Sequence, residues 1–171
     1  MMIFVLSLQK LQPFIMIKDN LEIKELNLEY ALILSERLSA ESKEYLKHFI
    51  PFAEYSEEYL KKILSEKKSD KYFGLFLNED LIGFYMLRGF DKGFDIPSYG
   101  VWISSKYSNK GLSTLTLYHA FSFCRLNKIK TLMLKVHPDN TVARNLYEKL
   151  GFERVGLDEK IGHLIYHKTI L

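Results

Sequence analysis

The sequence has little of what several common protein classes require. Its 171 residues include a single cysteine, Cys124, which excludes an intramolecular disulfide and any metal site built from a cysteine cluster. No apolar run approaches the ~18–20 residues needed to span a membrane. The 24 basic residues exceed the 21 acidic ones by only three, too small an excess to indicate nucleic-acid binding. With 47% apolar and 26% charged residues, the composition is that of an ordinary globular protein.

The amino-terminal residues are apolar but do not read as a secretion signal. They have no basic start, and polar residues between positions 9 and 12 interrupt the apolar stretch early. We therefore expect a cytoplasmic protein that binds neither membrane nor nucleic acid. Met16 begins a segment whose first strand is predicted at residues 21–26. Residues 1–15 are then either an upstream extension of a single domain at 16–171 or a short strand or helix packed on its core.

The pattern of apolar residues predicts one mixed α/β domain without repeats or linkers. In chain order it indicates a strand, helices, three strands, a helix, a strand, a helix and two final strands. Two nearly all-apolar runs flank a three-residue polar connection at 78–80, which is typical of a hairpin. Because both runs lack polar alternation, helices are expected on both faces of this sheet.

The first chemical signal is the segment that follows the strand predicted at 99–104. A short polar loop, 105–110, leads into a helix that starts near Gly111. Such a loop directs free backbone N–H groups to one point at the positive end of a helix dipole, where phosphate binds well. Gly111 also lets a ligand approach the backbone closely. Alone, this signal is weak, because any strand–loop–helix unit with one glycine would show it.

The second signal is a helix that begins at Asn140. Asn140 and Tyr147 are seven positions apart, so they lie on nearly the same helical face, with Ala143 between them. A polar group, a small residue and a phenol in line form a track ~10 Å long that suits a thin, extended ligand arm. By itself the pattern also fits a helix cap and a core aromatic.

Together the two segments resemble the GNAT superfamily of acyl-CoA-dependent N-acyltransferases over residues 72–171, and more loosely from 21. The family motif N-x-x-A-x-x-L-Y-x-x-x-G-F is matched in full, by Asn140, Ala143, Leu146, Tyr147, Gly151 and Phe152. The family's pyrophosphate loop, Arg/Gln-x-x-Gly-x-Gly/Ala, survives only at Gly111. The resemblance implies an α/β (α+β) fold: a single mixed, mostly antiparallel sheet with a splayed central strand pair and helices on both faces.

The resemblance also implies acetyl-CoA as co-substrate, no metal, and a set of cofactor-binding residues. In the family, the strand before the loop pairs its backbone with the pantetheine arm, and one of its N–H groups holds the thioester oxygen. Lys110 is expected to supply the positive charge that the degenerate loop lacks. The expected cofactor-binding residues are Val101, Trp102, Ile103, Ser108, Asn109, Lys110, Gly111, Leu112, Ser113, Asn140, Ala143 and Tyr147.

The implied reaction needs proton transfer but no nucleophilic side chain. The leaving thiol has a pKa of ~8.5 and an ordinary tyrosine ~10, so Tyr147, the expected general acid, either has a lowered pKa or mainly donates a hydrogen bond. Cys124 lies among apolar helix positions and is predicted to be a core residue. The amine acceptor, with a pKa of ~10.4, must lose a proton before or during its attack.

The base that accepts this proton is not identified by the motifs. Many relatives carry glutamate where this chain has Ser98, and serine is a poor base. Asp91 and Asp95 are alternatives as a base or as a binder of the substrate ammonium, although both also suit a turn. His48 is a candidate lining residue of the acceptor pocket, whereas His119 is predicted to be exposed. Alternatively, ordered water accepts the amine proton, and then no dedicated side chain is needed as the base.

The resulting expectation is an N-acetyltransferase, monomeric or homodimeric, that moves an acetyl group from acetyl-CoA to a primary amine by direct attack in a ternary complex. The segment 48–59 and the aromatic loop 90–94 suggest a closed pocket, which favours a small-molecule acceptor. Two alternatives stay open. The chain either acetylates protein amino termini or lysines, or it is a non-catalytic acyl-CoA-binding module.

Overall fold

The computed structural model describes residues 19–49 and 51–171. The predictions made for residues 1–15 lie outside this part of the chain, as does the domain start at Met16. Within it, seven strands form one sheet: β1 (Leu21–Glu25), β2 (Lys71–Leu77), β3 (Asp80–Arg88), β4 (Ser98–Ile103), β5 (Thr131–Val136), β6 (Glu153–Asp158) and β7 (His163–Thr169). The α-helices are α2 (Ala31–Ser39), α3 (Lys43–Leu46), α4 (Glu57–Glu66), α5 (Leu112–Leu126) and α6 (Thr141–Lys149). None of these helices is long and apolar enough to cross a membrane.

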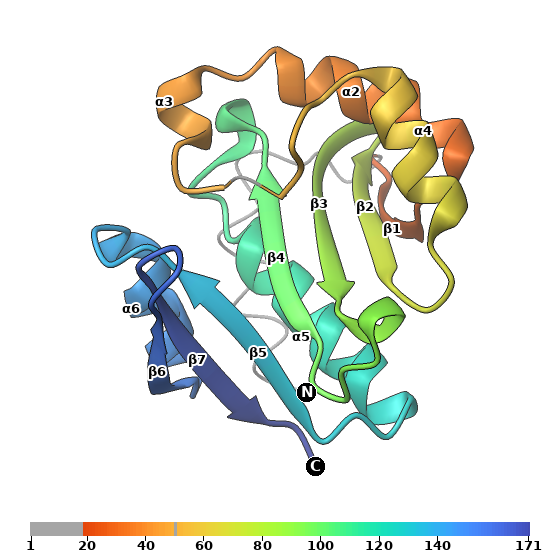
Figure 1. Cartoon of the computed structure of the whole chain (residues 1–171). Helices are drawn as coiled ribbons and strands as arrows, with labels where there is room; N and C mark the ends of the chain where they lie inside the picture. The colour runs from red at the N-terminus through yellow and green to blue at the C-terminus, as the bar shows by residue number, and fades with distance from the viewer. Residues whose placement is uncertain (1–18, 50) are drawn as a thin grey trace.

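The sheet has the order β1-β2-β3-β4-β5-β7-β6, and every neighbouring pair is antiparallel except β4 and β5. These two parallel strands pair only at their first residues, Ser98 with Met133 and Tyr99 with Leu134. Beyond Tyr99 they diverge, which opens a gap in the middle of the sheet (Figure 1). The prediction of a mixed, mostly antiparallel sheet with a splayed central pair is confirmed.

Short-range signals explain where several elements begin and end. Ser42 and Ser56 cap α3 and α4 by accepting hydrogen bonds from the N–H groups three residues on, and residues 40–42 separate α2 from α3. The hairpin connection has two residues rather than the predicted three. Asn78 and Glu79 both take left-handed backbone angles, which matches the twist of the paired strands and leaves Asp80 as the first residue of β3.

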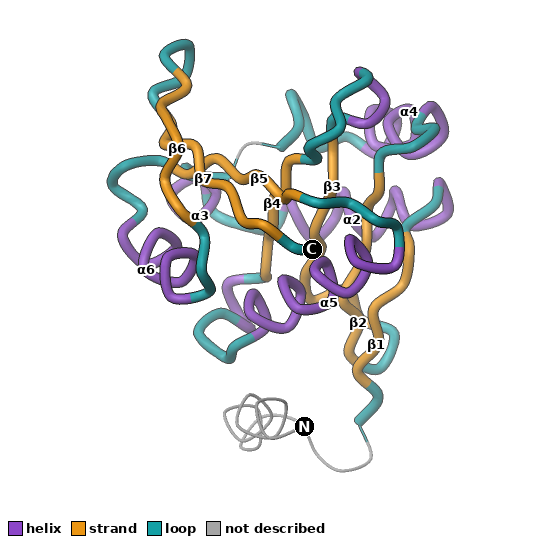
Figure 2. The backbone as a smooth tube through the Cα atoms, turned by 90° about the horizontal axis from the view of Figure 1, so that it is seen from below, coloured by secondary structure: helices purple, strands orange, loops and turns teal. Residues whose placement is uncertain are grey.

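Helices cover both faces of the sheet, as the apolar hairpin predicted. Figure 2 shows α5 and α6 on one side of the sheet and α4 on the other. One apolar cluster joins the sheet to α5 and α6 through Phe121, Leu134 and Phe152, and another joins it to α2 and α4 through Leu34, Leu60 and Phe84. A strand buried on two faces has no polar side, and this is why the hairpin sequence shows no alternation.

The long helix α5 both confirms and corrects the sequence analysis. Cys124 is fully buried, as predicted, and burial raises the pKa of its thiol to about 11. The prediction that His119 is exposed is wrong. Its ring is half-buried, its Nδ1 lies 2.7 Å from the Tyr85 hydroxyl oxygen, and it contacts Phe73 edge to face. Helical periodicity could not show that β2 and β3 pack against this side of α5.

Candidate active site

A cavity of about 860 Å³ opens where β4 and β5 diverge. Its walls come from β4, the loop after it, the first turn of α5, the end of β5 and one face of α6. The α3 segment closes one end with Tyr45, His48 and Phe49. The gap in the sheet therefore brings together the two segments that the sequence singled out, which are separated by about thirty residues along the chain.

The loop before α5 presents unpaired backbone donors to this cavity. The first intrahelical bond of α5 runs from the Leu115 N–H to the Gly111 carbonyl oxygen (3.1 Å), so the three N–H groups between them have no helical partner. Their residues, Leu112, Ser113 and Thr114, all line the cavity. Gly111 has a φ of +81°, and a Cβ built on it would meet no atom within 4 Å. The loop thus leaves open space in front of a helix N-terminus, which fits a phosphate group.

The edge of β4 supplies a second row of free backbone groups. The Ser104 N–H donates to the Ile82 carbonyl oxygen (2.9 Å), so by strand alternation the backbone of Trp102 is directed toward β3. Val101 and Ile103 then face the gap toward β5. The Tyr45 hydroxyl donates to the Ile103 carbonyl oxygen (2.8 Å) and ties α3 to the end of this strand. Of the three predicted strand residues, Val101 and Ile103 offer backbone donors to a ligand. Trp102 also lines the cavity, and its ring packs against Phe84 in the apolar cluster.

On α6, Asn140 and Tyr147 both line the cavity. The Asn140 side-chain oxygen caps the helix by accepting from the Ala143 N–H (3.2 Å), which leaves the amide NH₂ as the group that can meet a ligand. Tyr147 is 9% exposed, and burial raises the pKa of its phenol to about 12. Within the described residues its hydroxyl makes no hydrogen bond, so the phenolic proton is free for a ligand.

A second phenol in the cavity, which sequence reasoning missed, lacks this freedom. Tyr99 lies two residues before Val101 and therefore on the same face of β4. Its hydroxyl is 2.9 Å from the Thr116 hydroxyl oxygen, and Thr116 in turn donates to the Ser113 carbonyl oxygen (3.0 Å). Since the Thr116 proton is used there, Tyr99 must be the donor to Thr116. Of these two tyrosines, only Tyr147 has a proton to give.

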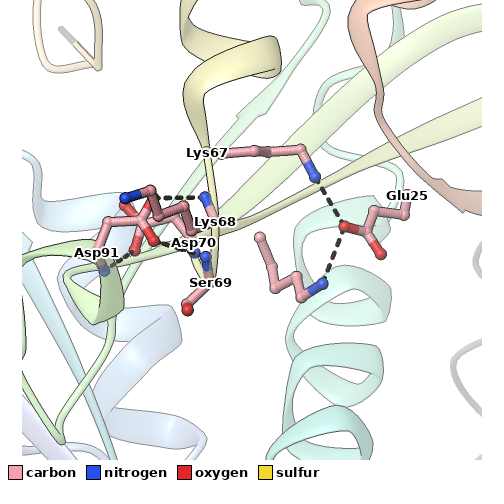
Figure 3. Close-up of polar contacts among 7 residues, drawn as sticks. Glu25, Lys67, Lys68, Ser69, Asp70 and Asp91 are labelled. Carbon is pink, nitrogen blue, oxygen red and sulfur yellow. Dashed lines mark hydrogen bonds and ion pairs between the residues drawn. The ribbon is translucent and has the colours of Figure 1, made fainter.

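The two aspartates proposed as base or ammonium binder lie elsewhere. Asp91 accepts hydrogen bonds from the N–H groups of Lys68, Ser69 and Asp70 (Figure 3). Asp70 in turn accepts from the N–H groups of Gly89 and Asp91. The hydrogen bonds to Asp91, of which the one from the Ser69 N–H has the largest effect, hold the pKa of Asp91 below its usual range. The Asp91 carboxylate thus fixes two loops to each other, in agreement with its alternative interpretation as a turn residue.

Asp95 lines a different, smaller cavity of about 550 Å³, together with Phe90 and Phe94. It precedes the end of β4 that pairs with β5, whereas the gap lies beyond the opposite end of that pairing. The expectation that the aromatic loop 90–94 closes the acceptor pocket is therefore wrong. The part of 48–59 that lines the large cavity is His48 and Phe49, while Phe52 packs in the core.

These two aspartates provide a matched pair of variants. We expect Asp91→Ala to lower stability by about 1 kcal/mol, or roughly 2–4 °C in Tm, because it removes three hydrogen bonds at an exposed site. Because the pKa of Asp91 is lowered in the folded state, this contribution is present above the ordinary aspartate pKa and is lost as pH falls through the folded value. Thermal melts at pH 7 and pH 3 check both points.

Asp95→Ala is the control, because the Asp95 carboxylate makes no hydrogen bond within the described residues. We expect its Tm and its acetyl transfer to match those of the parent protein. A large loss of kcat in Asp95→Ala, with Tm unchanged, would instead indicate that Asp95 takes part in the active site.

Of the residues predicted to bind cofactor, Lys110 does not line the cavity, and the other eleven do: Val101, Trp102, Ile103, Ser108, Asn109, Gly111, Leu112, Ser113, Asn140, Ala143 and Tyr147. Besides Tyr99, the sequence analysis missed Tyr45, Lys135 and Lys149. Lys149 adds positive charge to the cavity wall, whereas the charge of Lys135 is paired with Asp158 (2.7 Å). Their position on β5 and at the end of α6 carried no motif that could have marked them.

Comparison with known proteins agrees with this architecture. Residues 35–152 match the acetyltransferase (GNAT) family. No protein of curated function matches the sequence. The fold is shared with the PaiA N-acetyltransferase of Thermoplasma acidophilum in complex with coenzyme A, which is 24% identical, with 88% of this chain and 99% of that one covered and a TM-score of 0.70.

Two further solved structures show the same fold. A GNAT acetyltransferase of Streptococcus pneumoniae is 22% identical, with 89% of this chain and all of that one covered and a TM-score of 0.71. RimL, a ribosomal L7/L12 α-N-protein acetyltransferase in complex with coenzyme A, is 15% identical, with 87% and 93% covered and a TM-score of 0.73. The family match covers well over half of the chain. The chain therefore belongs to the GNAT family of acetyltransferases, and it is an acyltransferase.

Proposed function

We propose that the protein transfers the acetyl group of acetyl-CoA to a primary amine, by direct attack of the amine within a ternary complex. The observation that carries this proposal is a single cavity that combines the free donors of the α5 N-terminus, the unpaired edge of β4 and the free phenol of Tyr147. When bound, acetyl-CoA supplies an activated acyl group and a thiol leaving group.

The residues present fit that ligand. The N–H groups of Leu112, Ser113 and Thr114 hold the pyrophosphate in the space that Gly111 leaves open. The edge of β4 pairs with the extended arm, and the Asn140 amide NH₂ donates to it from α6. A backbone N–H of Val101 or Ile103 donates to the thioester oxygen and stabilises the negative charge that develops there.

Tyr147 acts on the sulfur as a hydrogen-bond donor rather than by complete proton transfer. Its pKa of about 12 lies about 3.5 units above that of the thiol, so full transfer of its proton to the thiolate is uphill by about 5 kcal/mol. A hydrogen bond to the departing sulfur needs no such transfer, and burial strengthens it. The alternative of a lowered tyrosine pKa does not apply.

For the acceptor we propose a small-molecule amine, such as an amino sugar or a polyamine. Tyr45, His48 and Phe49 bound one end of the cavity and support a pocket of limited size. A protein amino terminus is the second candidate. It is favoured by the similarity to RimL and by the position of the loop 90–94 outside the cavity wall.

The acceptor class is tested by incubating the protein and acetyl-CoA with a metabolite extract and, separately, with a peptide library. Mass spectrometry then identifies the acetylated products. Acetylated metabolites with no acetylated peptides support the first candidate, and the reverse result supports the second. If neither incubation gives an acetylated product and the protein does not bind acetyl-CoA, the protein has the fold but not the proposed activity.

Binding of acetyl-CoA is expected to stabilise the fold. At a ligand concentration about a hundredfold over Kd the gain is ~2.7 kcal/mol, which raises Tm by roughly 5–10 °C for a chain of this size. A thermal melt with and without acetyl-CoA measures the shift. An unchanged Tm at millimolar acetyl-CoA and millimolar CoA would argue against the cofactor itself.

A further inference from the structure

Three histidines from distant parts of the chain lie in a row that starts at the cavity. His48 follows α3 and lines the cavity at its acceptor end. Its ring centroid is 4.8 Å from that of His137, which follows β5, and the two planes are tilted by 31°. The His137 ring meets His163, the first residue of β7, edge to face at 5.5 Å. All three side chains are half-buried.

The middle imidazole, that of His137, is held by a hydrogen bond from the backbone. The Asp139 N–H donates to Nδ1 of His137 (3.1 Å), so this nitrogen presents its lone pair and the ring proton is on Nε2. The three rings do not form a metal site, because no group of three or more His, Cys, Asp or Glu side chains in the described part of the chain is arranged to hold a metal ion.

The charged groups around the row are largely paired with one another. On the α3 segment Glu44 pairs with Lys47, and on the sheet Lys135 of β5 pairs with Asp158 of β6 (2.7 Å). The Asp139 carboxylate is 83% exposed and 3.8 Å from His137 Nδ1.

The pKa of His163, at the solvent end of the row, is set by these surroundings. Burial and the neighbouring His137 hold the pKa of His163 below its ordinary value, with smaller contributions from His48 and Lys135, and Asp158 opposes the shift.

We propose that His48 is the base that accepts the proton lost by the acceptor amine, and that His137 and His163 hold its ring toward the cavity. This inference rests on the proposed function. A primary ammonium gives one proton to His48, directly or through one water. The amine nitrogen then forms its bond to the acetyl carbon as the carbon–sulfur bond breaks. The sulfur leaves as the thiol with the second amine proton, and His48 returns its proton to solvent.

His48 suits this role because the His137 ring packs against its own ring. The ring contact with His137 at 4.8 Å, with His163 packed on the far side of His137 at 5.5 Å, restricts rotation of the His48 side chain at the cavity wall. His137 and His163 are positioning residues in this scheme, because they do not reach the cavity wall themselves.

The test compares His48→Gln, His137→Gln and His163→Gln with the control His167→Gln. His167 is also half-buried and lies on β7 four residues beyond His163, outside the row. Release of thiol from acetyl-CoA is measured from pH 5 to 9 with three amines: putrescine, glucosamine and the peptide Ala-Ala-Ala. We expect His48→Gln to lose on the order of 10²-fold in kcat at pH 7, to lose the acidic limb of its pH profile, and to regain part of its rate with added imidazole.

The two positioning variants are expected to behave differently. Because His137 packs directly against His48 and His163 meets only His137, we expect His137→Gln to lower kcat more than His163→Gln, with KM for the amine unchanged and the rate partly restored by added imidazole. A purely structural loss would lower Tm without rescue by imidazole, and a role in binding the acceptor would raise KM at constant kcat. Either result, or a His48→Gln rate within twofold of the parent, overturns the inference.

A measurement that needs no activity separates this inference from the proposed function. NMR titration of the imidazoles is expected to show the Nε2–H form of His137 and a rise in the His163 pKa in His137→Gln. Independent titration of the three rings overturns the inference. A parent protein that neither binds acetyl-CoA nor releases thiol with any of the three amines refutes the proposed function, whereas an active parent with an unchanged His48→Gln variant refutes only the role of His48.

Discussion

Replacing Tyr147 by phenylalanine is expected to lower kcat by ~10²–10³, the loss typical of removing one hydrogen-bond donor to developing charge, while changing acetyl-CoA affinity little. The Tyr147 ring stays against Phe152, so the cavity wall is unchanged, and only the phenolic hydroxyl is lost. The measurement is kcat at saturating acetyl-CoA, with Kd determined separately by titration. An acceptor of known pKa should be used, because a rate limited by amine attack would reduce the loss.

Tyr166→Phe is the control for Tyr147→Phe. Its hydroxyl donates to the Glu148 carboxylate (2.6 Å) and does not line the cavity, so only stability is expected to change. The pH profile adds a second check. With a pKa of about 12, Tyr147 stays protonated through the working range, so any alkaline limb below about pH 10 belongs to another group and persists in the variant. A Tyr147→Phe enzyme with parental kcat at every pH would make Tyr147 a packing residue.

A carboxylate introduced at Gly111 is expected to weaken coenzyme A binding by on the order of 100-fold. Gly111 stands in open space at the start of α5, where the phosphates are proposed to lie. A unit charge about 5 Å from a phosphate costs about 3 kcal/mol at an effective dielectric constant of 20. Aspartate also tolerates left-handed backbone angles better than most residues, so Gly111→Asp is expected to fold. Calorimetric or fluorescence titration with CoA measures Kd.

The chain offers a matched control for Gly111→Asp. Gly93 has a nearly identical φ of +79°, and a Cβ there also meets no atom within 4 Å, but it lies in the loop before β4, outside the cavity wall. Gly93→Asp carries the same backbone strain and the same added charge, and its CoA affinity is expected to stay parental. Equal affinity loss in both variants would trace the effect to net charge or strain instead of to a phosphate site at Gly111.

The amino-acid sequence was enough to predict the features that depend on nearby residues. Ser56 and Asn140 cap their helices through N–H groups three residues away, and these signals are local. The all-apolar hairpin predicted a sheet covered by helices on both faces, and the motif from Asn140 to Phe152 indicated the family. The separation of Asn140 and Tyr147 by two turns sufficed to predict that they share one face of α6, since both line one cavity.

Contacts between distant segments had no such signal. Asp91 receives its hydrogen bonds from residues more than twenty positions away, His119 meets Tyr85 across 34 positions, and the imidazole row joins His48 to His137 and His163. Periodicity reports which face of its own element a side chain takes, but not which other element covers that face. Which element covers a given face depends on the tertiary packing, in which β4 and β5 diverge and α3 packs over the end of β4. The proposed proton acceptor, His48, could therefore be argued only from the folded chain.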